Sequence, residues 1–163
     1  MENITLNRTL EHMAWANTQM FTVLATLPAD ALAFTSPGSE WSVGAITHHV
    51  VTAAENYAQR LHGEPRAEKR ELPTTVADLA ALAAAVKVAD AKLLAGAQLP
   101  GDEIITWISY GGEEISVPRW VLVNQAVHHA TEHRAQIAGA LAANDNTTLD
   151  LDALDVWTYN DAL

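Results

Sequence analysis

Four long segments of the sequence repeat apolar residues at steps of three and four, and the turn-forming residues gather between these segments rather than inside them. This spacing places the apolar side chains on one face of an α-helix, which must pack against another element to leave water. The segments cover residues 5–25, 42–62, 75–97 and 118–143. We therefore predict an all-α fold, a four-helix bundle, with residues 1–163 forming one domain.

Local signals set the ends of the predicted helices. Pro28 ends the first helix, and Ser42 can cap the second. Thr75 followed by Asp78 resembles a capping box and opens the third helix, whose alanine-rich sequence we interpret as purely structural. Pro118 suits the first turn of the fourth helix.

The segment before the last helix has a different pattern. Residues 104–117 carry β-branched and aromatic side chains on both sides of Gly111 and Gly112, a dipeptide suited to a tight turn. We predict a short hairpin-like excursion there.

The aromatic residues are expected to be largely buried. In the acidic tail, Val156, Trp157 and Tyr159 are predicted to dock on the bundle. The tryptophans are predicted to pack in the core, with one or two at the mouth of a pocket: Trp15, Trp41, Trp107, Trp120 and Trp157.

Composition restricts the chemistry. The chain has no cysteine, so any metal must be bound through nitrogen or oxygen. Nine Lys and Arg against 20 Asp and Glu give a net charge of −11, which disfavours nucleic acid and anionic membranes as partners. No stretch is apolar enough to span a membrane, and the polar N-terminus lacks the pattern of a secretory signal, so we expect a cytoplasmic location.

The seven histidines include two adjacent pairs, His48–His49 and His128–His129, and His133 follows the second pair. Residues four apart in a helix differ by only about 40° in direction. His129 and His133 therefore project from one face, one turn apart, and can share an ion. His128 points away from that face.

Two imidazoles rarely hold a labile metal tightly, and a third from a facing helix would complete a site with positions open for water or substrate. His48 and His49 point about 100° apart, so only one of them can face inward; we take His49. The alternative is that these histidines are simply partly buried and hydrogen-bonded. The others are interpreted as surface or hydrogen-bonded residues: His12, His48, His62 and His128.

Three further polar residues could position the site or contact substrate. Asn17 lies mid-helix, where asparagine is a mediocre helix former, and it could hydrogen-bond into the site or join two helices. Arg134 and Gln136 flank the last histidine. They could orient its surroundings, contact an anionic substrate or lie on a solvated face, and we favour orientation.

Three motifs of the chain resemble the DinB/YfiT-like superfamily of metal-binding four-helix bundles, over nearly the whole length. The family's first helix is similar to the segment EHMAWANTQMFTVLATLP. Its Trp-Ser pattern, with a metal-binding histidine eight residues after the Trp, is similar to WSVGAITHHV and implies His49 as a ligand. Its His-x3-His-Arg-x-Gln signature is similar to HATEHRAQI and implies His129 and His133, with Ala135 where the family usually has Gly.

The resemblance also implies a function. Family members with known activity are mostly thiol-dependent transferases or isomerases, so we expect a metal-dependent enzyme that transfers a low-molecular-weight thiol to a small electrophile. Its cofactor would be a divalent metal ion, with zinc or nickel as our choice, its cosubstrate the thiol, and its assembly a homodimer. No catalytic residue is assigned.

Three alternatives remain at this stage. A metal-dependent hydrolase of a small amide or ester would activate water instead of a thiol. A non-catalytic metal-binding stress protein would have no pocket beside the metal. A purely structural helical dimer would bind no metal at all.

Overall fold

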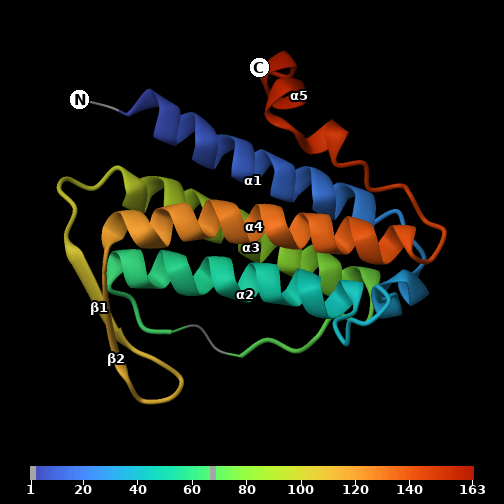
Figure 1. The fold of residues 1–163 in the computed structure, drawn as a ribbon, viewed down its shortest axis with the longest axis horizontal. Helices are drawn as coiled ribbons and strands as arrows, with labels where there is room; N and C mark the ends of the chain where they lie inside the picture. Colours follow the sequence, from blue (N-terminus) through green and yellow to red (C-terminus); the bar gives the residue numbers. More distant parts are fainter. Residues whose placement is uncertain (1–2, 67–68) are drawn as a thin grey trace.

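The computed structural model describes residues 3–66 and 69–163, and most of them are helical (Figure 1). The four long helices are α1 (Ile4–Leu24), α2 (Val43–His62), α3 (Val76–Ala97) and α4 (Arg119–Ala142). The shorter elements are β1 (Ile104–Ile108), β2 (Glu114–Pro118), α5 (Val156–Asp161) and two 3-10 turns at Ala29–Ala33 and Asp152–Leu154. The predicted all-α bundle with a hairpin before its last helix is confirmed, and each long helix begins and ends within one residue of its prediction.

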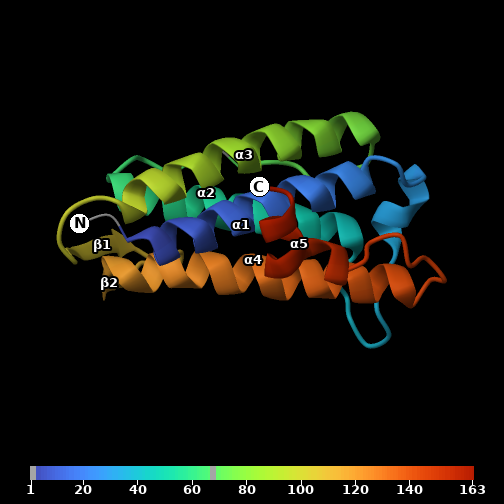
Figure 2. The same cartoon turned by 90° about the horizontal axis from the view of Figure 1, so that it is seen from above.

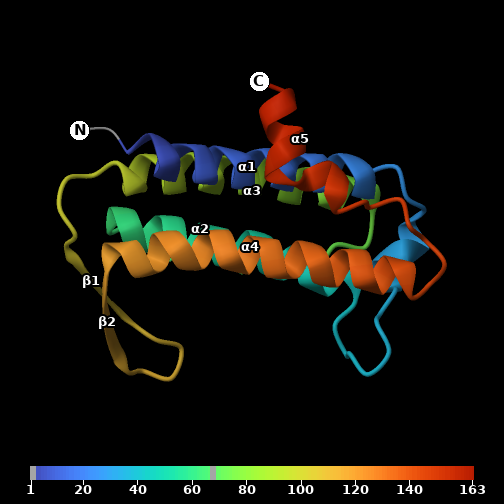
Figure 3. The same ribbon diagram turned by 45° about the horizontal axis from the view of Figure 1, so that its top comes forward.

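The helices form two layers. Figure 3 shows α1 and α3 in one layer and α2 and α4 in the other, and Figure 2 shows the same helices from above. Helix α2 packs on both α3 and α4, and α1 does the same from the opposite corner. Among the described residues, no helix has the length and apolar character needed to cross a membrane.

Capping residues fix where the helices begin and end. Ser42 Oγ accepts a hydrogen bond from the Ala45 amide at 3.2 Å, as its sequence position predicts. Thr75 and Asp78 form the predicted capping box at the start of α3. Such caps satisfy amides that have no partner inside the helix and contribute about 1 kcal/mol each. Gly63 ends α2 with φ of +64°, a conformation that glycine adopts without strain.

The hairpin ties the end of α3 to the start of α4. β1 and β2 are antiparallel, with Trp107 opposite Ile115. Arg119, at the start of α4, is buried, and its Nη1 donates to the carbonyl oxygens of Leu99, Pro100 and Gly101 at 2.7 to 3.1 Å. These carbonyls follow α3, so one guanidinium closes the connection between the two helices. Pro118 is the residue just before α4 rather than part of its first turn.

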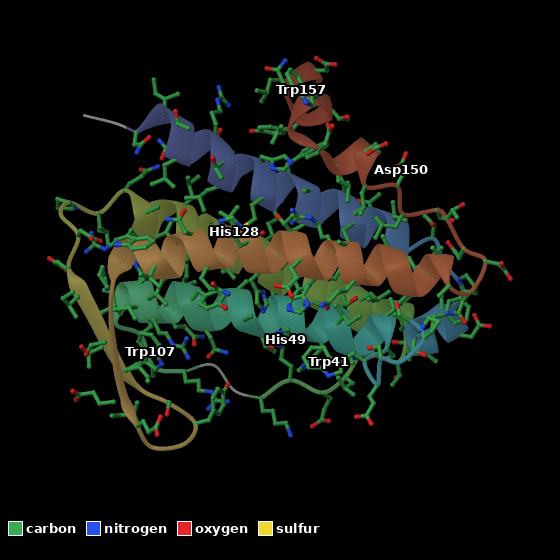
Figure 4. The ribbon with its side chains drawn as sticks, in the orientation of Figure 1. Trp41, His49, Trp107, His128, Asp150 and Trp157 are labelled. Atoms are coloured by element: carbon green, nitrogen blue, oxygen red, sulfur yellow. The ribbon has the colours of Figure 1, made fainter. Side chains whose placement is uncertain are left out.

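The tail docks through only one of the three residues predicted to dock. The Tyr159 ring lies 5.4 Å from the Trp15 ring and 5.6 Å from that of His12. Val156 and Trp157 are exposed, Trp157 by 78%, so the prediction was wrong for these two. Figure 4 shows Trp157 on the helix that projects from the bundle, because Tyr159 already fills the contact with α1.

The prediction that the tryptophans pack in the core holds for only two of them. Trp15 and Trp107 are half-buried against the core. Trp41, Trp120 and Trp157 are exposed, because they lie in a loop, on the outer face of α4 and on the projecting α5. The core is filled instead by aliphatic side chains and alanines from the four helices.

Candidate metal centre

Helix α4 carries two of the three histidines on one face. His129 and His133 are one turn apart, and their Nε2 atoms are 3.1 Å from each other. His133 is buried and His129 half-buried. The four-residue spacing therefore does what the helix geometry predicts, and the two rings face each other across one turn.

Helix α2 brings the third histidine to the same point. His49 Nε2 lies 2.9 Å from His129 Nε2, and the His49 ring centroid is 4.7 Å from that of His133. Ligand atoms of all three residues lie within 4.8 Å of one another. The predicted meeting of these three histidines is confirmed, and we call the group the histidine triad.

Gln136 determines which nitrogen of His133 carries the proton. Gln136 Oε1 lies 2.7 Å from His133 Nδ1. A carbonyl oxygen can only accept, so Nδ1 carries the hydrogen and donates it. The lone pair of His133 is therefore on Nε2, the atom that faces the other two histidines. This orienting contact was one of the roles predicted for Gln136.

Burial favours the neutral form of two members of the triad, His49 and His129, because it lowers the pKa of each. Burial, followed by the neighbouring His133 and His49, lowers the pKa of His129 to about 4. Burial also lowers the pKa of His49, with smaller effects from His133 and His48. Neutral imidazoles have the free lone pair that a metal ligand needs, so no proton has to be displaced first at these two residues.

The donor set fits a divalent cation. Three imidazole nitrogens converge: His129 Nε2 lies 2.9 Å from His49 Nε2 and 3.1 Å from His133 Nε2. Protons shared between such nitrogens satisfy them only pairwise, whereas one cation about 2.0–2.1 Å from each satisfies all three lone pairs. With no thiolate in the chain, the set suits zinc, nickel, copper or iron.

The other histidines have different partners. His12, His48 and His62 each donate from Nε2 to a backbone carbonyl oxygen, at 2.8, 2.9 and 2.9 Å. His128 is exposed on α4, and Figure 4 shows it apart from His49. These four fit the interpretation as hydrogen-bonded or surface residues.

Two aromatic side chains, Trp41 and Tyr57, contact the triad from different sides. Trp41 lies beside His49 (Figure 4), edge-on to it, with ring centroids 4.9 Å apart. Its ring is also nearly parallel to that of His133, at 6.2 Å. On the other side, the Tyr57 ring is 5.7 Å from that of His129. Trp41 is thus the tryptophan at the mouth of a pocket, although periodicity could not assign it.

A cleft adjoins the triad on the side of Trp41. Its volume is about 430 Å³, and it is lined by Ser36, Ser39, Trp41, Ile46, His133 and Gln136. No carboxylate or cationic side chain among the described residues lines it. The cleft offers hydroxyl, amide and aromatic contacts to a small molecule next to His133.

Asn17 and Arg134 lie in the core and join helices instead of entering the cleft. Arg134 Nη1 donates to Asn17 Oδ1 at 2.7 Å, and Asn17 Nδ2 donates to Asp90 Oδ2 at 3.0 Å. The three side chains are buried and connect α4, α1 and α3. Asp90 was not identified from the sequence, because nothing in the alanine-rich third helix distinguishes it.

Burial shifts the pKa values of Asp90 and Arg134, the two ionisable members of this network, in opposite directions. Burial raises the pKa of Asp90, and the net value is about 6 because the hydrogen bond from Asn17 and the charge of Arg134 offset part of the effect. Burial lowers the pKa of Arg134 to about 10, and Asp90 opposes this. Arg134 therefore stays charged at neutral pH, and the residue next to His133 is fixed to two other helices.

The fold and the triad define a helical bundle whose three histidines could hold a metal ion. The chain belongs to the DinB family: the family's model matches residues 1–154, which include all four long helices and the triad. A search of curated proteins finds no match.

Proposed function

We propose that this DinB-family protein is an enzyme that binds a divalent metal ion through His49, His129 and His133 and transfers a low-molecular-weight thiol to a small electrophile. The observation that carries the proposal is the open side of the triad. The three nitrogens converge from α2 and α4, and a cleft of about 430 Å³ begins at His133. Three protein ligands with an adjoining pocket are typical of catalytic rather than structural sites.

A bound divalent ion would supply Lewis-acid chemistry, lowering the pKa of a thiol or of water near it. The chain has no cysteine, so the thiol must come from a cosubstrate. In the transfer, the thiol proton goes to solvent and the sulfur forms a bond to the electrophilic carbon. The leaving group departs with the electron pair of the broken bond.

The residues around the triad would orient and shield the reactants. Gln136 holds the His133 ring through Nδ1 and leaves its Nε2 free. Trp41 covers one side of the triad, with its ring 4.9 Å from that of His49 and 6.2 Å from that of His133. Ser36 and Ser39 line the cleft, where their hydroxyl groups can donate to a polar atom of the electrophile.

The composition of the cleft favours transfer over hydrolysis. Cleaving an amide requires an acid that protonates the departing amine. None of the described residues that line the cleft is an aspartate or a glutamate. A thiol that attacks a carbon with a good leaving group needs no such acid. A non-catalytic metal-binding stress protein, in turn, has no need of the adjoining cleft.

The proposal is tested by a conjugation assay with metal-loaded protein, 1-chloro-2,4-dinitrobenzene and a series of small thiols. We expect thioether and chloride to form above the uncatalysed rate in the wild type and in the control variant His128→Ala, and both rates to fall to the uncatalysed background in His129→Ala. Turnover of an amide or ester without any thiol would instead support the hydrolase. Tight metal binding without turnover of either kind would support the non-catalytic role.

A further inference from the structure

A second cleft lies on the other flank of α2, between that helix, the segment that follows it and the turn of the hairpin. Its volume is about 200 Å³. Six of its lining residues are Thr52, Asn56, Arg66, Lys69, Arg70 and Tyr110. We call it the cationic cleft, and neither the histidine triad nor the proposed transfer accounts for it.

The cationic cleft gathers positive charge in an acidic protein. Three of the chain's nine Lys and Arg side chains line it, although the net charge is −11. Among the described residues, the one carboxylate that lines it, Glu55, binds Arg70 through both oxygens, at 2.6 and 3.0 Å. Within residues 3–66 and 69–163, neither Arg66 nor Lys69 pairs with a carboxylate. The described side chains therefore leave two positive charges uncompensated.

The hairpin holds one of these charges in place. The guanidinium of Arg66 lies over the ring of Tyr110, 3.8 Å from its centroid. Stacking on an aromatic face leaves the in-plane N–H groups of arginine free to donate. Arg60 is held in a similar way over Trp107, at 4.4 Å. The hairpin thus carries two aromatic platforms for arginines that come from the end of α2 and just beyond it.

The overall negative charge does not prevent an anion from binding here. Charges more than about 8 Å apart in solvent are largely screened at physiological ionic strength. An oxyanion in the cleft would interact mainly with Arg66 and Lys69, because Glu55, the one described carboxylate that lines the cleft, is paired with Arg70. A guanidinium also matches the geometry of a carboxylate or phosphate better than a point charge does.

We propose that the cationic cleft binds a small oxyanion, the carboxylate or phosphate group of a small molecule. The cleft and the triad occupy the same part of α2, since His48 lines the cleft and His49 belongs to the triad. Asn56, also in the cleft, is seven residues from His49, or about 10 Å along the helix axis. If the proposed function holds, the anionic group belongs to the cosubstrate or the electrophile.

The test measures anion binding without turnover, so it can succeed even if the proposed transfer fails. Inorganic phosphate and malonate are titrated separately into the full chain at low ionic strength, with calorimetry and backbone amide NMR shifts as readouts. The test variant is Arg66→Gln/Lys69→Gln. The control, Arg8→Gln/Lys87→Gln, removes the same charge from two exposed residues on α1 and α3. Both are compared with the wild type, zinc-loaded and metal-stripped.

We expect at least one probe to bind the wild type with shifts at Thr52, Asn56 and Tyr110, whether or not zinc is present. Binding should weaken at least about tenfold in Arg66→Gln/Lys69→Gln and less than about twofold in the control, since only the first variant removes charge-assisted hydrogen bonds to the anion. Which probe binds more tightly distinguishes carboxylate from phosphate. Equal weakening in both variants, binding that requires zinc, or no binding of either probe would overturn the proposal.

Discussion

His133 Nδ1 donates a hydrogen bond to the side-chain oxygen of Gln136 at 2.7 Å. Gln136 lies about one turn after His133 on α4, and this bond is on the side of the ring away from the other two histidines. The bond fixes both the tautomer and the direction of the ring, because only Nε2 is left to face His49 and His129. In metal sites, such partners of ligating histidines fix the tautomer and the ring orientation, and their loss typically lowers metal affinity.

Replacing Gln136 should therefore weaken metal binding without removing a ligand. We expect Gln136→Ala to lower metal affinity by about 10- to 100-fold, because His133 loses the acceptor that orients it. Gln136→Glu keeps an acceptor and should bind at least as tightly as the wild type. Competition against a chromogenic chelator measures both. Equal affinity of Gln136→Ala and wild type would mean that packing alone orients His133.

Asn17 should matter for stability far more than its helical position suggests. It bridges the buried Arg134 and Asp90, with bonds of 2.7 and 3.0 Å. Asn17→Ala leaves both charged groups without this partner, which we expect to cost about 3 kcal/mol of unfolding free energy. Thr18→Ala, on the exposed side of the same helix, should change it by less than about 0.5 kcal/mol. Urea denaturation measures both, and similar values for the two variants would contradict the bridging role.

The metal-free protein should lose stability as the medium becomes acidic. The ordinary pKa of histidine is 6.5, whereas that of His129 in the folded protein is about 4. Between these values the unfolded chain binds a proton that the folded chain refuses, so the unfolding free energy falls as pH drops from 6.5 towards 4. Above pH 6.5 both states are neutral at this residue and the effect vanishes.

The titration of Asp90 has the opposite effect on the unfolding free energy between about pH 4 and pH 6. Its pKa rises from 3.8 to about 6 on folding, so its contribution to stability falls as pH rises from 3.8 to about 6. Thermal denaturation from pH 4 to 8 should therefore show a shallower acid loss in His129→Gln and a steeper one in Asp90→Asn than in the wild type. Parallel profiles for all three proteins would contradict both assignments.

The parts of the fold that depend on local sequence were predictable. Apolar spacing locates the four long helices, and Ser42 and Thr75 mark two of their starts, because a cap acts within three residues. The hairpin follows from Gly111 and Gly112 between β-branched segments. His129 and His133 share a face because their spacing alone requires it.

Features that join distant segments were not predictable. Asp90 meets Asn17 across 73 residues, and neither helix pattern indicates that pairing. Trp41 lies in a loop, where no periodicity specifies its direction. The cationic cleft combines α2, the segment after it and the hairpin, which only the tertiary structure brings together. Trp157 was predicted to dock because it is apolar, but Tyr159 occupies the contact with α1.

The most direct test of the metal centre is the metal content of the purified protein and of five single variants. His49→Ala, His129→Ala and His133→Ala remove members of the triad, while His48→Ala and His128→Ala remove the adjacent histidines. We predict near-stoichiometric metal by elemental analysis in the wild type and both controls, and its loss in the three triad variants. A wild type without metal after reconstitution with zinc or nickel, or equal metal in all five variants, would contradict the proposal that the triad is a metal site.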